Sequence, residues 1–154
     1  MLRVTVYLGA DHRGFRLKNR LVAYLEGRKG LEVIDLGAEE LVLDDDYPDI
    51  SQKVGMAVRE DPGSLGILLC GSGVGATIAA NKIRGVRASL VPDAWTAQAG
   101  RNDDDMNVIC LAADRMTFEQ TKRIVRTFLQ SSFSEAKRFR RRRAKVQKLD
   151  QQRP

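Results

Sequence analysis

An apolar segment, Leu65–Cys70, runs directly into a loop with Gly71, Gly73 and Gly75, and this junction constrains the fold more than any other feature of the chain. A run of apolar residues without polar alternation is typical of a central parallel strand that is covered on both faces. The apolar stretch after the loop indicates a helix. Because neighbouring parallel strands need a crossover between them, usually a helix, the junction predicts an α/β fold.

Units of this kind repeat along the chain, since short apolar segments that end near glycine alternate with longer segments of helical periodicity. Strands are expected at Arg3–Leu8, Leu31–Leu36, Leu65–Cys70, Val86–Val91 and Val108–Ala112. Helices are expected at Phe15–Glu26, from Pro48 to about Arg59, through Ala79–Lys82, and at Asp93–Arg101 and Thr117–Leu129. Such a pattern predicts a parallel sheet with helices on both faces. Ligands of these sheets bind outside the carboxyl ends of the strands, which singles out residues 9–14, 70–75 and 114–115.

The composition is that of a globular protein, with 43% hydrophobic and 30% charged residues. No apolar run approaches the roughly 18 residues that are needed to cross a bilayer. The first residues reach glycine and charge too early for a secretory signal. The two cysteines, Cys70 and Cys110, show no spacing that indicates a disulfide framework. These features predict a cytoplasmic protein that does not associate with membranes.

The net charge of +6 is concentrated at the C-terminus. Residues 134–154 contain nine Lys and Arg against two acidic residues, a charge of +7, so residues 1–133 sum to −1. We therefore expect an α/β domain at residues 1–133 and a basic tail at residues 134–154, helical over about Ser134–Lys148.

The arginines of this tail have two interpretations. Arg138 and Arg142 are four residues apart and share one face of a helix, a spacing suited to holding one phosphate group. The rival interpretation is a patch that binds nucleic acid, and part of the run could be only a solvated face. Phe139 is the only aromatic residue among the basic ones, and the rest of the chain is nearly neutral. Both observations argue against nucleic acid as a partner.

The glycine loop is a candidate anion site, because such a turn directs backbone N–H groups and the positive end of a helix into the crevice. A turn that merely connects strand and helix is the alternative. The loop lacks the Lys-Ser/Thr ending of a P-loop, and it is not the first β–α turn of a dinucleotide site. Cys70 directly precedes it, so the helix N–H groups favour a thiolate that acts as base or nucleophile. A small buried apolar residue is the alternative for Cys70, and Cys110 fits that alternative well.

Three further side chains are expected at the same edge of the sheet. Asp11 and His12, the only histidine, follow the first strand, and Tyr47 follows an acidic stretch. Each also has a simpler explanation, because an Asp-His pair often caps a helix and a tyrosine can anchor a loop.

At the level of whole segments, the chain resembles the B-type ribose-5-phosphate isomerases and the related galactose-6-phosphate isomerase subunits. The resemblance covers nearly the whole chain. It is carried by GADHRGFRLK at residues 9–18, DYP at 46–48, GILLCGSGVGATIAANKIRGVRA at 66–88, AQAGRN at 97–102 with the following Asn107-Val108, and the Arg138/Arg142 pair.

The resemblance implies a three-layer αβα sandwich with a five-stranded parallel, Rossmann-like sheet and a C-terminal basic helix. It implies a homodimer, or a tetramer, with active sites shared between subunits, and an aldose–ketose isomerisation of a sugar phosphate through a cis-enediolate without metal or other cofactor. Cys70 would be the catalytic base, and Asp11 would handle a sugar hydroxyl or the ring oxygen. Ser72 and the amides of Gly71, Gly73 and Gly75 would form the anion hole. The phosphate would be held by His12, Arg115, Arg138 and Arg142, with Tyr47, Asp104 and Asn107 also in contact with substrate.

One departure from the family pattern bears on the substrate. The family usually has His-Asn-Asp-x-Asn before the fifth strand, and this chain has Asp103 and Asp104 in place of the His and the first Asn. The resemblance implies that this histidine opens the furanose ring of ribose 5-phosphate. Asp103 could take over that step with help from Asp104 and Asp105, because crowded carboxylates favour protonation of one of them. Alternatively, ring opening is not required, as for erythrose 4-phosphate, or the substrate is a hexose 6-phosphate such as allose or galactose 6-phosphate. Ribose 5-phosphate remains the favoured substrate.

Two other classes of function compete with an isomerase. A non-catalytic subunit that binds sugar phosphates predicts binding without turnover, and the retained Cys70, Ser72 and glycine loop argue against it. A protein that binds nucleic acid through its tail predicts a steeply salt-dependent affinity for DNA.

Overall fold

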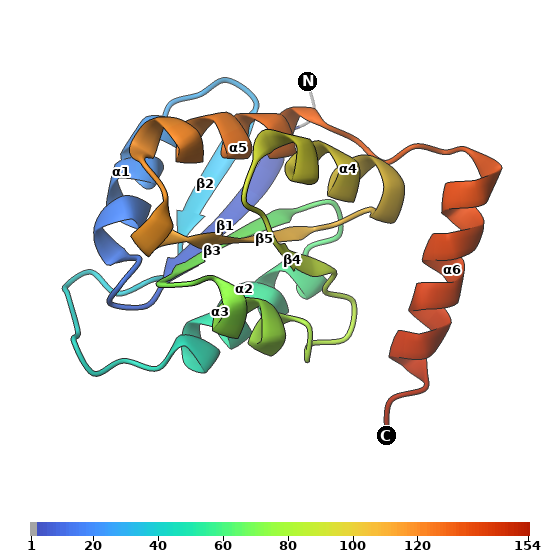
Figure 1. Cartoon of the computed structure of the whole chain (residues 1–154), viewed down its shortest axis with the longest axis horizontal. Helices are drawn as coiled ribbons and strands as arrows, with labels where there is room; N and C mark the ends of the chain where they lie inside the picture. The colour runs from blue at the N-terminus through green and yellow to red at the C-terminus, as the bar shows by residue number, and fades with distance from the viewer. Residues whose placement is uncertain (1–2) are drawn as a thin grey trace.

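The computed structural model of the protein describes residues 3–154 and has a five-stranded parallel sheet at its centre (Figure 1). The strands lie in the order β2-β1-β3-β5-β4. They are β1 (Val4–Ala10), β2 (Leu31–Asp35), β3 (Leu65–Cys70), β4 (Ala88–Leu90) and β5 (Val108–Ala112). All four strand pairs are parallel, which confirms the α/β fold and the five strands predicted from the sequence.

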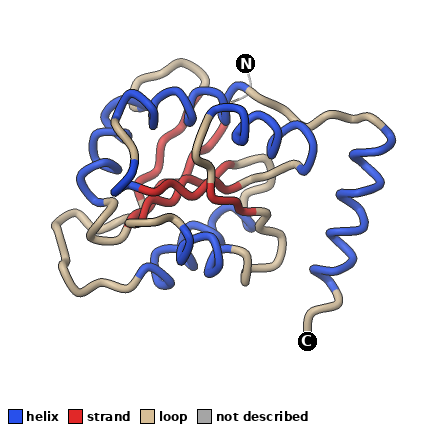
Figure 2. Tube along the Cα trace, viewed as in Figure 1, coloured by secondary structure: helices blue, strands red, loops and turns tan. Residues whose placement is uncertain are grey.

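Helices cover both faces of this sheet and complete a three-layer sandwich (Figure 2). They are α1 (Phe15–Leu25), α2 (Tyr47–Glu60), α3 (Val74–Ala80), α4 (Ala94–Asp104), the short 3₁₀ helix η1 (Ala113–Arg115), α5 (Phe118–Gln130) and α6 (Lys137–Gln151). Helices α1, α4 and α5 pack on one face, and α2 and α3 pack on the other (Figure 1). No helix within residues 3–154 has the length and apolar character to cross a membrane.

Strand β3 divides its side chains between two hydrophobic cores. All six of its residues are buried, and successive side chains point to opposite faces of the sheet. Ile67 and Leu69 belong to the core under α1, α4 and α5, whereas Leu68 and Cys70 belong to the core under α2 and α3. The alternation therefore places the Cys70 side chain on the α2–α3 side of the sheet, at its carboxyl edge.

The third helix ends at Ala80, before the expected Lys82. The fourth strand and the fourth helix also differ in length from the sequence-based expectation. The fourth strand is shorter than Val86–Val91, because the Val86 N–H donates to the Ile83 carbonyl (3.1 Å) in a turn. The fourth helix extends beyond Arg101 to Asp104, and Asp105 ends it in the left-handed region with φ 52°. Asp103 and Asp104 therefore lie on the last helical turn and not in a loop.

Helix α6 stands beside the sandwich and not within a layer (Figure 1). Its buried residue is Phe139, 8% exposed. Its far end is held by the Asp150 carboxylate, which accepts from the Gly85 N–H (2.6 Å), and by Arg153, which donates to the Asn81 carbonyl (2.7 Å). The helix begins three residues later than the expected Ser134 and ends three later than Lys148.

Candidate active site

The three segments singled out by the sequence meet at the carboxyl edge of the sheet. The Asp11 N–H donates to the Leu69 carbonyl (3.2 Å), and the Asp114 N–H donates to the Gly71 carbonyl (3.1 Å). The Arg13 guanidinium forms an ion pair with the Asp114 carboxylate and so links the first and third segments. The prediction that residues 9–14, 70–75 and 114–115 come together is confirmed.

Cys70 is the last residue of β3, and its sulfur accepts a hydrogen bond from the Gly73 N–H (N···S 3.1 Å). Gly73 adopts φ 76°, a conformation that glycine reaches without strain and that turns its amide toward the sulfur. Cys70 is 4% exposed and belongs to the α2–α3 core, which also contains Val54 and Ala76. Cys70 is therefore more enclosed than the sequence suggested, and the glycine loop is the polar part of its surroundings.

The other two glycines of the loop allow side chains to lie directly against it. A Cβ added to Gly71 would lie 2.6 Å from Nε of Arg13, and one added to Gly75 would lie 2.6 Å from Cζ of Tyr47. The ring of Tyr47, at the start of α2, thus covers the loop, as the sequence-based interpretation proposed. The Ser72 side chain is exposed, and its hydroxyl accepts from the Val74 N–H (3.3 Å).

Asp11 and His12 occupy the same edge with partners of their own. One oxygen of the buried Asp11 carboxylate accepts from the N–H groups of Arg13 (3.0 Å) and Gly14 (3.1 Å), so this residue caps the turn before α1. His12 is held by Asp45, whose Oδ1 lies 2.8 Å from Nδ1 of the ring and accepts from the His12 N–H (2.9 Å). Arg115 is exposed in η1, next to Asp114.

The second cysteine is a core residue. Cys110 lies in the middle of β5, fully buried on the same face as Cys70. Burial raises the pKa of its thiol to about 12, so it is protonated at neutral pH. This placement agrees with its interpretation as a small apolar side chain.

A second group of predicted site residues lies at the opposite, amino edge of the sheet. The Asn107 carbonyl accepts from the N–H of Gly66 near the start of β3 (2.8 Å), which marks this edge. The Asn107 side chain accepts from the Arg87 N–H (2.8 Å) and donates to the Gly85 carbonyl (2.9 Å). Both polar atoms of this amide are thus engaged in holding the start of β4, away from Cys70.

Asp103 and Asp104 end α4 at this amino edge, where α6 presents its arginines. Partial burial, and then the Asp103 carboxylate, raise the pKa of Asp104, and the Arg142 guanidinium opposes this rise. Arg138 and Arg142 are exposed on α6. One chain therefore carries the predicted site in two parts, with Cys70 and the glycine loop at one edge and these four residues at the other.

Sequence reasoning missed three residues of these two regions. Arg13 lies over Gly71, Asp45 holds His12, and Asp105 gathers arginines at the amino edge. Arg13 and Asp45 carried a signal, because each adjoins a motif that was singled out. Asp105 stands at the retained Asp of the His-Asn-Asp-x-Asn pattern, but its contacts with Arg87 and Arg143 carried no signal, since these two arginines come from distant parts of the chain.

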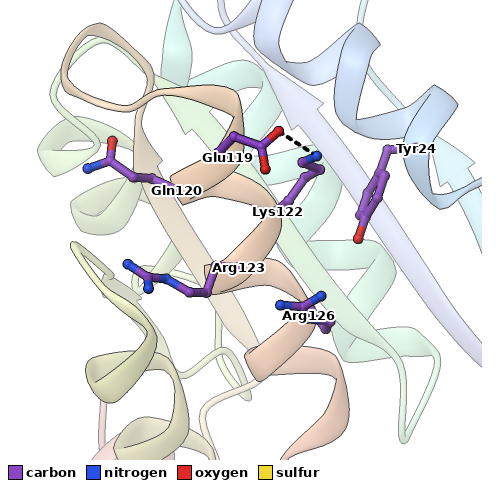
Figure 3. A pocket seen from close by; sticks show the side chains of 6 residues that line it. All are labelled: Tyr24, Glu119, Gln120, Lys122, Arg123 and Arg126. Atoms are coloured by element: carbon purple, nitrogen blue, oxygen red, sulfur yellow. Dashed lines mark ion pairs between the residues drawn. The ribbon is translucent and has the colours of Figure 1, made fainter.

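A shallow cavity of about 380 Å³ lies between α1 and α5, away from both groups (Figure 3). Tyr24 lines it from α1, and the remaining lining residues, Glu119 to Arg126, belong to α5. Lys122 forms an ion pair with Glu119 (2.6 Å). None of the predicted site residues contributes to this cavity. Within residues 3–154, no three His, Cys, Asp or Glu side chains are grouped so that they could hold a metal ion.

Known proteins share both the sequence and the fold. Residues 6–148 match the family described as Ribose/Galactose Isomerase. A probable ribose-5-phosphate isomerase B of Mycoplasma pneumoniae is 45% identical over 128 residues, which cover 83% of this chain and 84% of that protein. The ribose-5-phosphate isomerase B of Mycobacterium tuberculosis (strain CDC 1551) is 40% identical over 142 residues, covering 92% and 87%.

A solved structure agrees over the full length. The crystal structure of ribose-5-phosphate isomerase B from Mycoplasma genitalium with bound ribulose-5-phosphate has a TM-score of 0.93 and 36% identity, and it covers 99% of this chain and 100% of its own. The family match spans most of the chain, and the relatives exceed 30% identity over most of their length. The chain therefore belongs to the ribose/galactose isomerase family and is an enzyme of the isomerase class.

Proposed function

We propose that this enzyme interconverts ribose 5-phosphate and ribulose 5-phosphate in the cytoplasm, with Cys70 as the base. The observation that carries the proposal is the Gly73 N–H donated to the Cys70 sulfur at 3.1 Å, because a donor at this distance stabilises a thiolate. The Cys70 thiolate takes the proton from C2 of the open-chain aldose, and a cis-enediolate forms. The same proton is returned to C1, while the proton of the C2 hydroxyl passes to O1, so that C1 becomes a hydroxymethyl group and C2 the ketone.

The glycine loop stabilises the charge that develops on the enediolate oxygens. Preorganised donors aimed at such charge are worth several kcal/mol, roughly 2.7–4 for a single donor. The N–H groups of residues 71–75 and the exposed Ser72 hydroxyl are the nearest donors in sequence to the thiol. Asp11 orients a sugar hydroxyl, while His12 and Arg115, with Tyr47 over the loop, bind the far end of the substrate.

A second copy of the chain completes the site. Asp103, Asp104, Arg138 and Arg142 lie at the amino edge, so in one chain they are separated from Cys70 by the length of the sheet. In the proposed dimer the amino-edge group of each copy faces the carboxyl edge of the other, and two-fold symmetry then completes both sites at once, because every contact of an isologous interface occurs twice. Large apolar side chains exposed on α3, α4 and α6 supply a surface for this contact, namely Val74, Ile78, Trp95, Val146 and Leu149.

A comparison of substrates tests the reaction. Turnover of ribose 5-phosphate, allose 6-phosphate and erythrose 4-phosphate is measured side by side with the parent enzyme, Cys70→Ala and the control Cys110→Ala. We expect ribose 5-phosphate within about tenfold of the best substrate, and a loss of about 10²–10⁴ in kcat for Cys70→Ala only. If another sugar phosphate is turned over more than tenfold faster than ribose 5-phosphate, that sugar is the preferred substrate, and Asp103 and Asp104 mark a change of specificity. Binding without turnover by the parent enzyme would identify a non-catalytic subunit.

Mixing of two inactive variants tests the shared site. Cys70→Ala retains the arginines of α6, and the double variant Arg138→Gln/Arg142→Gln retains the thiol. Random exchange of subunits makes half of the dimers mixed. Each mixed dimer has one site that combines an intact thiol with intact arginines, and one site that has neither. A quarter of all sites are then intact, so activity at low substrate concentration should recover to about a quarter of the parent value. A mixture no more active than its components, although subunits exchange, would refute the shared site.

A further inference from the structure

One carboxylate gathers three arginines at the amino edge of the sheet. Asp105 accepts from Arg143 Nε (2.6 Å), Arg87 Nη2 (3.1 Å) and Arg101 Nη1 (3.3 Å). The three guanidinium groups come from α6, from the residue before β4 and from α4. Within residues 3–154, Asp105 is the only non-glycine residue with positive φ, 52°. The backbone thus adopts an uncommon conformation at the point where these elements meet.

The Asp105 carboxylate balances the charge of all three arginines, and Asp150 adds a weaker contribution at Arg87. Their side chains are 14–32% exposed, and Asp105 is the single acidic residue that lines the adjoining cavity of about 280 Å³. Burial lowers the pKa of Arg87 and of Arg101, and the Asp105 carboxylate opposes both shifts. Without the carboxylate, three cations would face one another in a partly dry site, which is strongly unfavourable.

The arginine from α6 fixes the orientation of that helix. Arg143 is four residues after the buried Phe139, so both lie on the face of α6 that packs toward the sandwich. Arg138 and Arg142 each precede one of these residues, and both are exposed. The contact between Asp105 and Arg143 therefore sets which way the neighbouring arginine pair points.

We propose that Asp105 is a positioning residue, which anchors α6 through Arg143 so that Arg138 and Arg142 are presented to the phosphate of the substrate. This inference rests on the proposed function, in which those two arginines hold the phosphate. Asp105 touches no reacting atom. It acts by removing the freedom of α6 before the substrate binds, and its effect is on affinity.

Kinetics of Asp105→Asn test the proposal. Asparagine tolerates the left-handed conformation and keeps the shape of the side chain, but it lacks the charge. We expect KM for ribose 5-phosphate to rise about tenfold and kcat to change less than about threefold, since a lost binding contact raises KM without slowing chemistry. Inorganic phosphate should inhibit more weakly by the same factor. The control Glu40→Gln removes an exposed carboxylate and should change nothing.

Chemical rescue separates anchoring from a general loss of structure. Asp105→Gly also suits the left-handed backbone and leaves room for a small anion beside the three arginines. Added formate should lower the raised KM of Asp105→Gly toward the parent value and leave that of Asp105→Asn unchanged. If Asp105→Asn does not fold, Arg143→Gln replaces it, with the exposed Arg141→Gln as its control.

Limited digestion with trypsin gives a readout that needs no activity. The run Arg140–Arg143 on α6 offers cleavage sites, and a loosened helix is cut faster. Faster cleavage of Asp105→Asn than of Glu40→Gln supports the anchoring of α6 by Asp105. Absence of sugar-phosphate turnover by the parent enzyme would refute only the proposed function and would leave this result intact. Equal cleavage, an unchanged KM, or a fall in kcat at constant KM would overturn the positioning role.

Discussion

The two edges of the sheet are built by different means. At the carboxyl edge, Cys70 and its loop are defined by backbone groups, with the Gly73 amide 3.1 Å from the sulfur and glycines where side chains would collide. At the amino edge, Asp105 forms side-chain ion pairs with Arg101 of the preceding helix and with Arg87 and Arg143 of distant elements. The site made from the local loop should therefore be most sensitive to changes in the backbone, and the site made from ion pairs most sensitive to changes in charge.

The largest effect is expected at the backbone-defined edge, from Gly73→Ala. A Cβ there would lie 2.5 Å from Leu90 Cδ1 and 3.2 Å from the Leu111 carbonyl carbon, and φ is 76°. The loop must shift, so we expect kcat to fall about 100-fold, as for loss of one anion-hole donor. The free energy of unfolding should fall by about 2–3 kcal/mol. Steady-state kinetics and urea unfolding provide the measurements.

Gly63→Ala is the matched control for this change. Gly63 also has positive φ, 91°, but a Cβ there meets no atom within 4 Å. Gly63→Ala should lower the free energy of unfolding by only about 1 kcal/mol, because alanine disfavours positive φ, and the enzyme should keep its full activity. Equal losses of activity in the two variants would show that strain alone, and not the amide next to the thiol, matters.

The next largest effect is expected at the amino edge, where Arg142→Gln should raise KM. The side chain is exposed beside Asp104, and charge-assisted hydrogen bonds to phosphate are worth about 1.5–3 kcal/mol, so KM should rise about 30-fold at nearly constant kcat. Initial rates over a range of substrate concentrations measure this. Arg140→Gln, on the same exposed run, should leave KM unchanged. A rise of KM in both variants would indicate a diffuse charge effect.

Alkylation compares the two thiols directly. The pKa of Cys110 is about 12, so about one molecule in 10⁴ carries its thiolate at pH 8. Iodoacetamide should therefore modify Cys70 at least about tenfold faster, as mass spectrometry of peptides would show, and ribulose 5-phosphate should protect it. Equal rates at the two cysteines would argue that the Gly73 amide does not activate Cys70.

The smallest effect concerns the carboxylates at the end of α4. Because the Asp103 charge raises the pKa of Asp104, Asp103→Asn should lower that pKa, and Arg142→Gln, which removes an opposing cation, should raise it. Both shifts should be small, because solvent screens charges at this exposed site. Carbon-detected NMR titration measures both. Shifts of the same sign would contradict the placement of Arg142 beside Asp104.

The sequence by itself determined the sheet, the glycine loop and the position of Cys70 at a strand end. These follow from local patterns, because an apolar run closed by glycines has few ways to fold, and parallel strands bring their carboxyl ends together. The local pattern also identified Asp11, His12 and Tyr47, which all lie at that edge.

Only the tertiary structure decided the rest. It showed that Cys70 is enclosed by the α2–α3 core, that Asn107 holds the start of β4, and that Asp103 and Asp104 lie a sheet length away from the thiol. It also revealed Asp105 as the meeting point of Arg87, Arg101 and Arg143. The ion pairs of Asp105 with Arg87 and Arg143 join residues 18 and 38 positions apart. Such pairs, like side-chain burial, leave no periodic trace in a sequence, because they depend on how separate elements pack and not on the order of neighbouring residues.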